Sequence, residues 1–394
     1  MRIAQIAPLQ AATPPHAYGG TERVIYNLTE SLVQLGHEVT LFATGDSRTS
    51  ARLVPAVAEA VNFDPDTVIS AYHIAMLADV YRQASDFDLI HSHLDHLTLP
   101  FIGTTRTPTV LTLHGRVDTP ELERVYGAYA GANYVAISHN QRRSQPNANW
   151  IATVHNGIDV KNYTYHPVAG DYLCFVGRIS PDKRPERAIE VAKRVGIPLK
   201  IAAKIGPEDR QYFTSVVEPM FDHPLIEFLG QLDETSKREL IGNALALLAP
   251  IDWPEPFGMV FIEALASGTP VLTCPVGSAP ELLADGVTGY LRQTVDELVE
   301  AVGQLGDISR STCRRYALER FDMRRMTLGY TRIYSQLQNP AVSLVKPAAV
   351  DQRAPVQRSP LGSTSGANAP LGDLSESGAG GHAQSTPSVA SDVL

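Results

Sequence analysis

Short apolar runs alternate with longer segments of helical periodicity along most of this chain, and the alternation occurs in two successive series. The runs expected to be strands are residues 2–7, 38–43, 88–93, 109–114, 134–138 and 151–154, then 173–176, 199–203, 226–229, 245–248 and 271–274. The helical patterns between them cover residues 21–35 and 66–84, then 184–195, 208–220, 234–243, 259–266 and 279–284. Repeated βα units predict parallel sheets with helices on both faces, and two such series predict two α/β domains.

The boundaries follow from changes in this pattern. Residues 1–158 are expected to form the first domain, 159–170 a linker without periodicity, and 171–320 the second domain. A last helix is expected within 321–338. Residues 341–394 are rich in Ala, Ser, Gly and Pro and contain no Phe, Trp or Tyr, so this tail is predicted to be disordered.

Charge and cysteine content narrow the classes of function. The formal net charge of -9 argues against a nucleic-acid partner. Three widely spaced cysteines predict neither a disulfide framework nor a structural zinc site. The N-terminal residues lack the pattern of a signal peptide, and no run reaches the ~18 apolar residues of a membrane-spanning helix. We therefore expect a cytoplasmic protein, and peripheral membrane contact stays open.

The most informative stretch is PEPFGMVFIEALASGTPVL, residues 254–272. Glu255 lies in a proline-flanked loop, and Glu263 lies on the helix that follows a tight turn. The N-terminus of that helix faces the carboxyl edge of the preceding strand, where ligands bind in open α/β sheets. The ligand-binding residues expected in this stretch are Glu255, Phe257, Gly258, Met259, Val260 and Glu263.

Two glutamates eight positions apart in this strand–loop–helix frame resemble the motif of the group 1 (family 4) retaining glycosyltransferases. The resemblance extends over roughly residues 1–338. It implies the GT-B architecture, in which two Rossmann-like domains face each other across a cleft. It also implies a nucleotide-sugar site on the second domain, an acceptor site on the first, and a final helix that crosses back to the first domain.

A second match to the family is the segment GRISPDKRPERAIE, which begins at Gly177. In the family, the Arg and Lys of this segment bind the donor diphosphate, which assigns that role to Arg178 and Lys183. A guanidinium and an ammonium would stabilise the charge that collects on the departing diphosphate. Arg184 stands where the family often has Gly. This difference is expected to affect the shape of the loop more than its charge.

Two further segments resemble the family in the first domain. Gly19 and Gly20 lie in a GGTE sequence that opens the first long helix, with Thr21 as its expected N-cap. The resemblance places these glycines beside the diphosphate and the acceptor. His114 ends the run LTLHG and resembles the family histidine that contacts the donor sugar.

The function expected from the resemblance is retaining transfer of a hexose, by default glucose from UDP-glucose, to a small-molecule, lipid or saccharide acceptor. The expected catalytic residues are Arg178, Lys183, His114 and Glu255, without metal or cofactor. One alternative is a nucleotide-sugar epimerase or hydrolase of the same fold, and another is a non-catalytic nucleotide-sugar binder. A third is a metal-dependent hydrolase, because His91, His93, Asp95 and His96 form an HxHxDH sequence with metal-ligand spacing.

Overall fold

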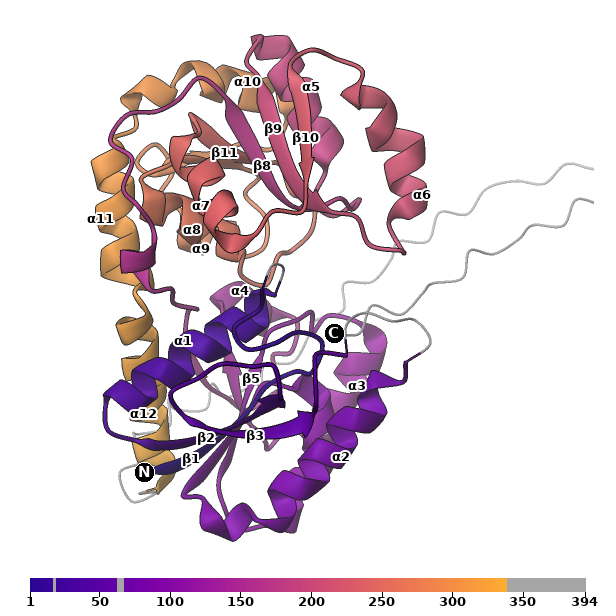
Figure 1. The fold of residues 1–394 in the computed structure, drawn as a ribbon, viewed down its shortest axis with the longest axis vertical. Helices are drawn as coiled ribbons and strands as arrows, with labels where there is room; N and C mark the ends of the chain where they lie inside the picture. The colour runs from indigo at the N-terminus through magenta and orange to yellow at the C-terminus, as the bar shows by residue number, and fades with distance from the viewer. Residues whose placement is uncertain (17–18, 62–66, 339–394) are drawn as a thin grey trace, which may run out of the picture. The chain divides into compact units, whose positions relative to one another are not determined.

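The computed structural model describes residues 1–16, 19–61 and 67–338, and it contains two α/β domains, each built on one parallel sheet (Figure 1). The tail expected at 341–394 lies outside the described residues. The strand order of both sheets begins 3-2-1-4-5-6, the order of a Rossmann sheet. The prediction of two Rossmann-like domains with parallel sheets is therefore confirmed.

The first sheet has seven strands in the order β3-β2-β1-β4-β5-β6-β7. Their bounds are Arg2–Ile6 (β1), Glu38–Thr44 (β2), Arg52–Val57 (β3), Leu89–Ser92 (β4), Thr109–Leu113 (β5), Asn133–Ala136 (β6) and Trp150–Thr153 (β7).

Successive residues of β1 point to opposite faces of this sheet, as a strand requires. Ile3 packs in a core cluster with α1 (Gly20–Gln34) and α12 (Met323–Gln338). Ala4 and Ile6 pack in another cluster with α2 (Ile69–Arg82). The remaining helical elements of this domain are η1 (Ala84–Asp86), η2 (Asp95–Thr104), α3 (Pro120–Ala128) and α4 (His139–Arg143), and η3 (Val160–Asn162) leads to the second domain.

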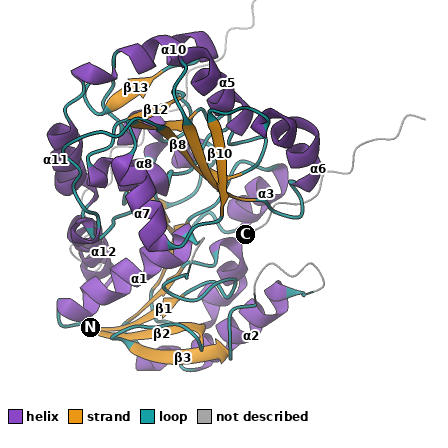
Figure 2. Ribbon diagram, turned by 45° about the horizontal axis from the view of Figure 1, so that its top comes forward, coloured by secondary structure: helices purple, strands orange, loops and turns teal. Residues whose placement is uncertain are grey.

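The second sheet has six strands in the order β10-β9-β8-β11-β12-β13. Their bounds are Leu173–Arg178 (β8), Leu199–Lys204 (β9), Ile226–Gly230 (β10), Ala246–Ala249 (β11), Val271–Thr273 (β12) and Gly289–Leu291 (β13). Figure 2 shows α5 (Pro185–Val195) and α10 (Val295–Gly303) together on one side of these strands, with α7 (Glu234–Asn243) and α8 (Met259–Ser267) on the other. The remaining helical elements are α6 (Arg210–Tyr212), η4 (Phe213–Val217), η5 (Glu218–Phe221), α9 (Ala279–Leu282), η6 (Leu305–Asp307) and α11 (Arg310–Phe321).

The last helix, α12, follows the second sheet in the chain but packs on the first. Tyr330 and Tyr334 are fully buried in a cluster with residues of β1, β4 and β5. The chain enters this helix beside residue 157, where a Cβ on Gly157 would lie 2.8 Å from the Cα of Met323. Glycine at this position therefore permits the close backbone approach.

Several elements differ from the sequence-based expectations. Strands β3 and β13 were not predicted, and both lie at sheet edges. Pro55 interrupts the strand pattern of β3, and proline is tolerated there because an edge strand needs no second ladder of hydrogen bonds. Helices α3 and α4 were also not predicted, and residues 208–220 form α6, η4 and part of η5 instead of one helix. The capping prediction for Thr21 is wrong, because Gly19 is the N-cap of α1.

Candidate functional site

Strands β8 and β11 are neighbours in the second sheet but are not consecutive in the sequence. The order of the strands therefore reverses between them. The connections that leave two such strands turn to opposite faces, so a crevice opens beyond their carboxyl ends. Gly177 and Arg178 end β8, and Lys183 follows in the next loop. Glu255 lies in the loop after β11. This edge of the sheet therefore carries most of the residues expected to hold the donor.

Lys183 and Glu255 meet across this crevice. The Nζ of Lys183 donates a hydrogen bond to Oε2 of Glu255 and lies 5.3 Å from the centre of the Trp253 ring. A main-chain bond from Asp252 N to Asp182 O, 3.0 Å long, joins the same two loops. The Lys183 and Glu255 side chains are 21% and 14% exposed, so a ligand could reach both.

Arg178 lies at the same edge but contacts a different loop. Its Nη1 is 3.2 Å from Oε1 of Glu208, and its Nε is 3.3 Å from Oδ2 of Asp209. Both acids precede α6. The structure thus places Arg178 beside the crevice with acidic partners of its own.

The loop after β11 ends in a turn that starts α8. Gly258 is the N-cap residue of this helix and has a φ of 86°. A Cβ there would lie 2.7 Å from the Phe261 ring, so glycine satisfies both the backbone angle and the space. Met259 and Val260 begin the helix, and the first N–H groups of a helix lack partners within it. Phe257 is only 3% exposed, so it anchors the turn in the core and is not open to a ligand.

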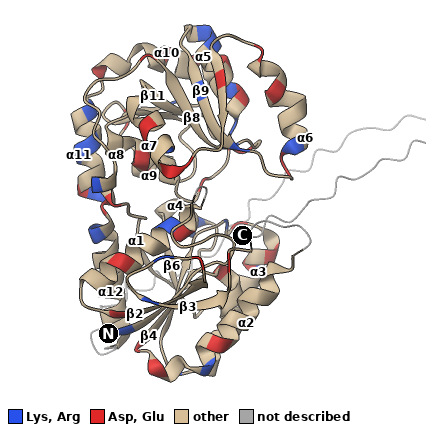
Figure 3. Ribbon diagram, viewed as in Figure 1, with Lys and Arg blue, Asp and Glu red and all other residues tan. Residues whose placement is uncertain are grey.

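Glu263 is buried on α8 and belongs to a chain of ion pairs. Lys237 of α7 lies 3.0 Å from its carboxylate, and the same Nζ is 3.0 Å from Glu234. Arg23 of α1 is 2.8 Å from Glu234. Figure 3 shows charges of both signs along α7. Burial alone would raise the pKa of Glu263, but Lys237 and Arg23 outweigh it and hold the pKa below its ordinary value. Glu263 is therefore ionised and forms its ion pair with Lys237 of α7, whereas Lys183 pairs with Glu255.

The glycines at the start of α1 lie close to the start of α8. A Cβ on Gly20 would be 3.6 Å from Cγ of Met259. Gly19 has a φ of 156°, and a Cβ there would lie 2.7 Å from Cβ of Pro15. Glu22, one turn into the helix, is 6% exposed, and its burial raises the pKa of the carboxyl to about 7. This buried carboxyl is the glutamate of the GGTE sequence, of which only the two glycines were expected to be site residues.

Replacing Gly19 with Ala is expected to lower the free energy of unfolding by about 2 kcal/mol, because the added methyl meets Pro15 in a conformation that disfavours a side chain. Gly36→Ala is the matched control. Its φ is also positive, at 82°, but nothing lies within 4 Å of the added Cβ, so about 1 kcal/mol is expected. Chemical denaturation of both variants measures the difference. Equal losses would contradict the steric argument.

His114 follows β5 and is held from two sides. Its main-chain N–H donates to Oδ1 of Asp95 at 3.1 Å, and its Nε2 is 2.8 Å from Nδ1 of His93. Burial lowers the pKa of His114 to about 3, so the ring is neutral. The next residue, Gly115, lines a small hollow together with Pro254 and Pro256. The chain neighbours of His114 and of Glu255 therefore line one hollow.

The HxHxDH sequence does not present its histidines to a metal. His91 bonds to Tyr334 and Thr112, at 2.7 Å each, through its two ring nitrogens. Those of His93 bond to His114 and Gln5. Among the described residues no group of three or more His, Cys, Asp or Glu side chains is arranged to hold a metal ion. The geometry thus gives the metal-hydrolase alternative no support.

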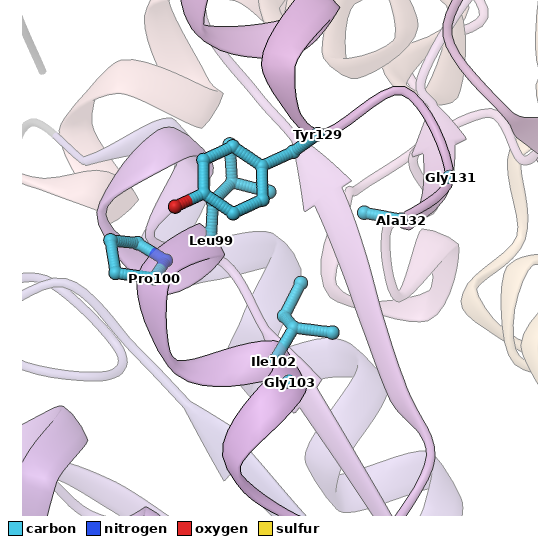
Figure 4. Close-up of a pocket in the computed structure, with 7 residues that line it drawn as sticks. All are labelled: Leu99, Pro100, Ile102, Gly103, Tyr129, Gly131 and Ala132. Carbon is cyan, nitrogen blue, oxygen red and sulfur yellow. The ribbon is translucent and has the colours of Figure 1, made fainter.

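A second hollow, of about 380 Å³, lies elsewhere on the first domain (Figure 4). It is lined by apolar groups such as Leu99, Ile102 and Tyr129. Its remaining walls include Gly131 and Ala132, which precede β6 and so lie at the amino edge of the sheet. This hollow is therefore on the side opposite to the strand ends that carry His114. In the described part of the chain no helix is long and apolar enough to cross a membrane.

Two family models match the chain. Residues 18–162 match the model described as Glycosyltransferase Family 4, and residues 165–318 match Glycosyl transferases group 1. D-inositol 3-phosphate glycosyltransferase of Mycolicibacterium smegmatis is 25% identical over 355 residues, covering 73% of this chain and 79% of that protein. Phosphatidyl-myo-inositol mannosyltransferase of the same organism is 25% identical over 340 residues, covering 74% and 80%. The solved structure of Anabaena HepE with UDP-glucose has a TM-score of 0.66 at 18% identity, covering 85% of this chain and all (100%) of that one.

Proposed function

The chain belongs to the group 1, family 4 glycosyltransferases with the GT-B fold, and on that premise we propose that it transfers a hexose from a nucleotide diphosphate sugar with retention of configuration. The observation that carries the proposal is the Lys183–Glu255 pair across the crevice of the second sheet. A cation and a carboxylate in one accessible place suit a ligand that has both an anionic part and sugar hydroxyls.

In this proposal the diphosphate draws Lys183 away from Glu255 when the donor binds. Lys183 and Arg178 then stabilise the negative charge that grows on the leaving diphosphate, more in the transition state than before it. Glu255, released from its partner, accepts hydrogen bonds from hydroxyls of the sugar. Glu263 accepts bonds from the ribose, in competition with Lys237.

We propose a front-face reaction, since the described residues near Lys183 and Glu255 offer no convincing nucleophile for a covalent double displacement. The bond between the anomeric carbon and the phosphate oxygen breaks while the acceptor oxygen bonds to that carbon on the same face. The acceptor proton passes to the phosphate oxygen. This route needs no metal and no cofactor.

The donor is expected to bind mainly to the second domain (171–320) and the acceptor mainly to the first (1–158). UDP-glucose is the first donor to examine, since HepE was solved with it. The relatives are named for an inositol phosphate and for a phosphatidyl-inositol, so small-molecule and lipid acceptors both belong in the screen, with saccharides.

A thermal-shift screen of UDP-, GDP- and ADP-sugars tests donor binding, because a ligand of the native state raises the melting temperature. We expect one class to raise it by several degrees, and to support transfer of labelled sugar to an acceptor in the presence of EDTA. Release of free sugar without transfer would favour a hydrolase. Loss of activity in EDTA together with stoichiometric zinc would revive the HxHxDH alternative.

A further inference from the structure

Polar side chains form a row beneath α12 inside the first domain. Gln5, His91 and Thr112 lie on three neighbouring strands, on the sheet face that packs against this helix, and all are fully buried. They bond to the hydroxyls of Tyr330 and Tyr334. Buried polar groups are tolerated only when they are hydrogen bonded, and the members of this row satisfy one another.

The row is continuous with His114 through a single residue, His93. Oε1 of Gln5 is 2.9 Å from Nε2 of His93, and Nδ1 of His93 is 2.8 Å from Nε2 of His114. At the other end, Nε2 of Gln5 is 3.3 Å from the hydroxyl of Tyr334. The chain of bonds therefore runs from α12 to His114, whose neighbour Gly115 lines the hollow.

Donor and acceptor chemistry sets the protons along this chain. A carboxamide oxygen only accepts, so His93 donates from Nε2. Burial lowers the pKa of His93 well below its usual value, so the ring carries one proton and its Nδ1 accepts. His114 must then donate from Nε2. Because His114 is also neutral, its Nδ1 carries a lone pair.

The hydrogen bond to His93 occupies only one of the two ring nitrogens of His114. Within residues 1–16, 19–61 and 67–338, no protein group hydrogen bonds to Nδ1 of His114, and the side chain is only half-buried. The neighbouring Gly115 lines the hollow that Pro254 and Pro256 close from the Glu255 side. A lone pair at this point suits a hydroxyl donor and repels an acceptor.

We propose that Gln5 and His93 are positioning residues that hold His114 in its Nε2–H tautomer, so that Nδ1 accepts a hydrogen bond from a hydroxyl of the bound sugar. The tautomer follows from the hydrogen-bond network and the neutrality of the two buried rings, whereas the sugar contact rests on the proposed function. Neither Gln5 nor His93 touches the ligand. Both act through the orientation and protonation of His114.

The tautomer is tested by NMR on ligand-free protein labelled with ¹⁵N-histidine, with the His114 signals identified by their loss in His114→Asn. The wild type is expected to show an unprotonated Nδ1 and a protonated Nε2. The opposite pattern would overturn the proposal. This result is independent of any transferase activity, so it stands or falls separately from the proposed function.

The role of Gln5 in fixing this tautomer is tested with Gln5→Met. The substitution keeps the volume of the side chain but removes the acceptor for His93. His114 is then expected to become a mixture of tautomers. Tyr334→Phe is the matched control, since it deletes one hydroxyl from the same row but leaves the Gln5–His93 bond. It should retain the wild-type tautomer. An unchanged His114 in Gln5→Met, or equal effects of both variants, would overturn the positioning role.

A kinetic measurement tests the proposed contact between His114 and the sugar. With an active donor, Gln5→Met is expected to lose about three- to tenfold in kcat/KM, the size of one weakened hydrogen bond, while Tyr334→Phe stays near the wild type. A donor that lacks the bonded hydroxyl should remove the difference between Gln5→Met and wild type. Persistence of the difference with every singly deoxygenated donor would overturn the sugar contact while leaving the tautomer assignment intact.

Discussion

Lys183→Ala is expected to lower the turnover of sugar transfer about 10²- to 10³-fold while leaving the fold intact. Removing one preorganised donor from a site of developing charge has effects of this size. The side chain is partly exposed, and its one hydrogen-bond partner among the described residues is Glu255, which is itself partly exposed, so its loss leaves no fully buried group unsatisfied. The effect should fall on kcat more than on KM, because the charge on the leaving diphosphate grows only as the bond breaks.

The matched control for this variant is Lys200→Ala. Lys200 also has an acidic partner, Glu227 at 3.7 Å, and lies 4.4 Å from the centre of an aromatic ring, that of Tyr172. It occupies the start of β9, at the amino edge of the sheet, and should keep wild-type kcat. Steady-state kinetics with saturating donor compares the two. Similar activity of both variants would remove Lys183 from the reaction.

The fold was predictable because its dominant signal is local. Buried parallel strands read as short apolar runs, and helices such as α5 and α8 repeat their apolar residues at helical spacing. The elements that were missed lack this signal. Strand β13 has only three residues and begins with Gly289, and β3 contains Pro55. Their strand character comes from pairing with a neighbour, which the sequence of the strand itself does not encode.

The site was predictable only in part, for a related reason. Lys183 and Glu255 come after strands that end at one edge, so their meeting follows from the order of the strands. The bond between Glu263 and Lys237 depends on how α7 packs beside α8, and no sequence pattern indicates that packing. The row from Tyr334 to His114 joins residues more than two hundred positions apart. In the sequence, its histidines showed only a spacing that resembles metal ligands.

Arg310 was also not recognised from the sequence. Its side chain is 9% exposed, and its guanidinium donates to the carbonyl oxygens of His166, Gly242 and Ala244 and to Oγ1 of Thr269, at 2.6–2.9 Å. Gly242 and Ala244 stand at the C-terminal end of α7, where helix carbonyls lack partners within the helix. A cation there also interacts favourably with the helix dipole.

Arg310→Ala is therefore expected to lower the free energy of unfolding by about 3–5 kcal/mol, because several buried carbonyls lose their donors together. Arg315→Ala is the matched control, being an exposed arginine on the same helix, and should change stability by less than about 0.5 kcal/mol. Chemical denaturation compares the two variants. Arg310 connects α11 to the end of α7, and α7 carries Lys237 beside Glu263. We expect the variant to weaken donor binding only in proportion to the fraction of the protein that is unfolded. A selective loss of binding in protein that remains folded would instead show that the guanidinium positions α7 for the ligand.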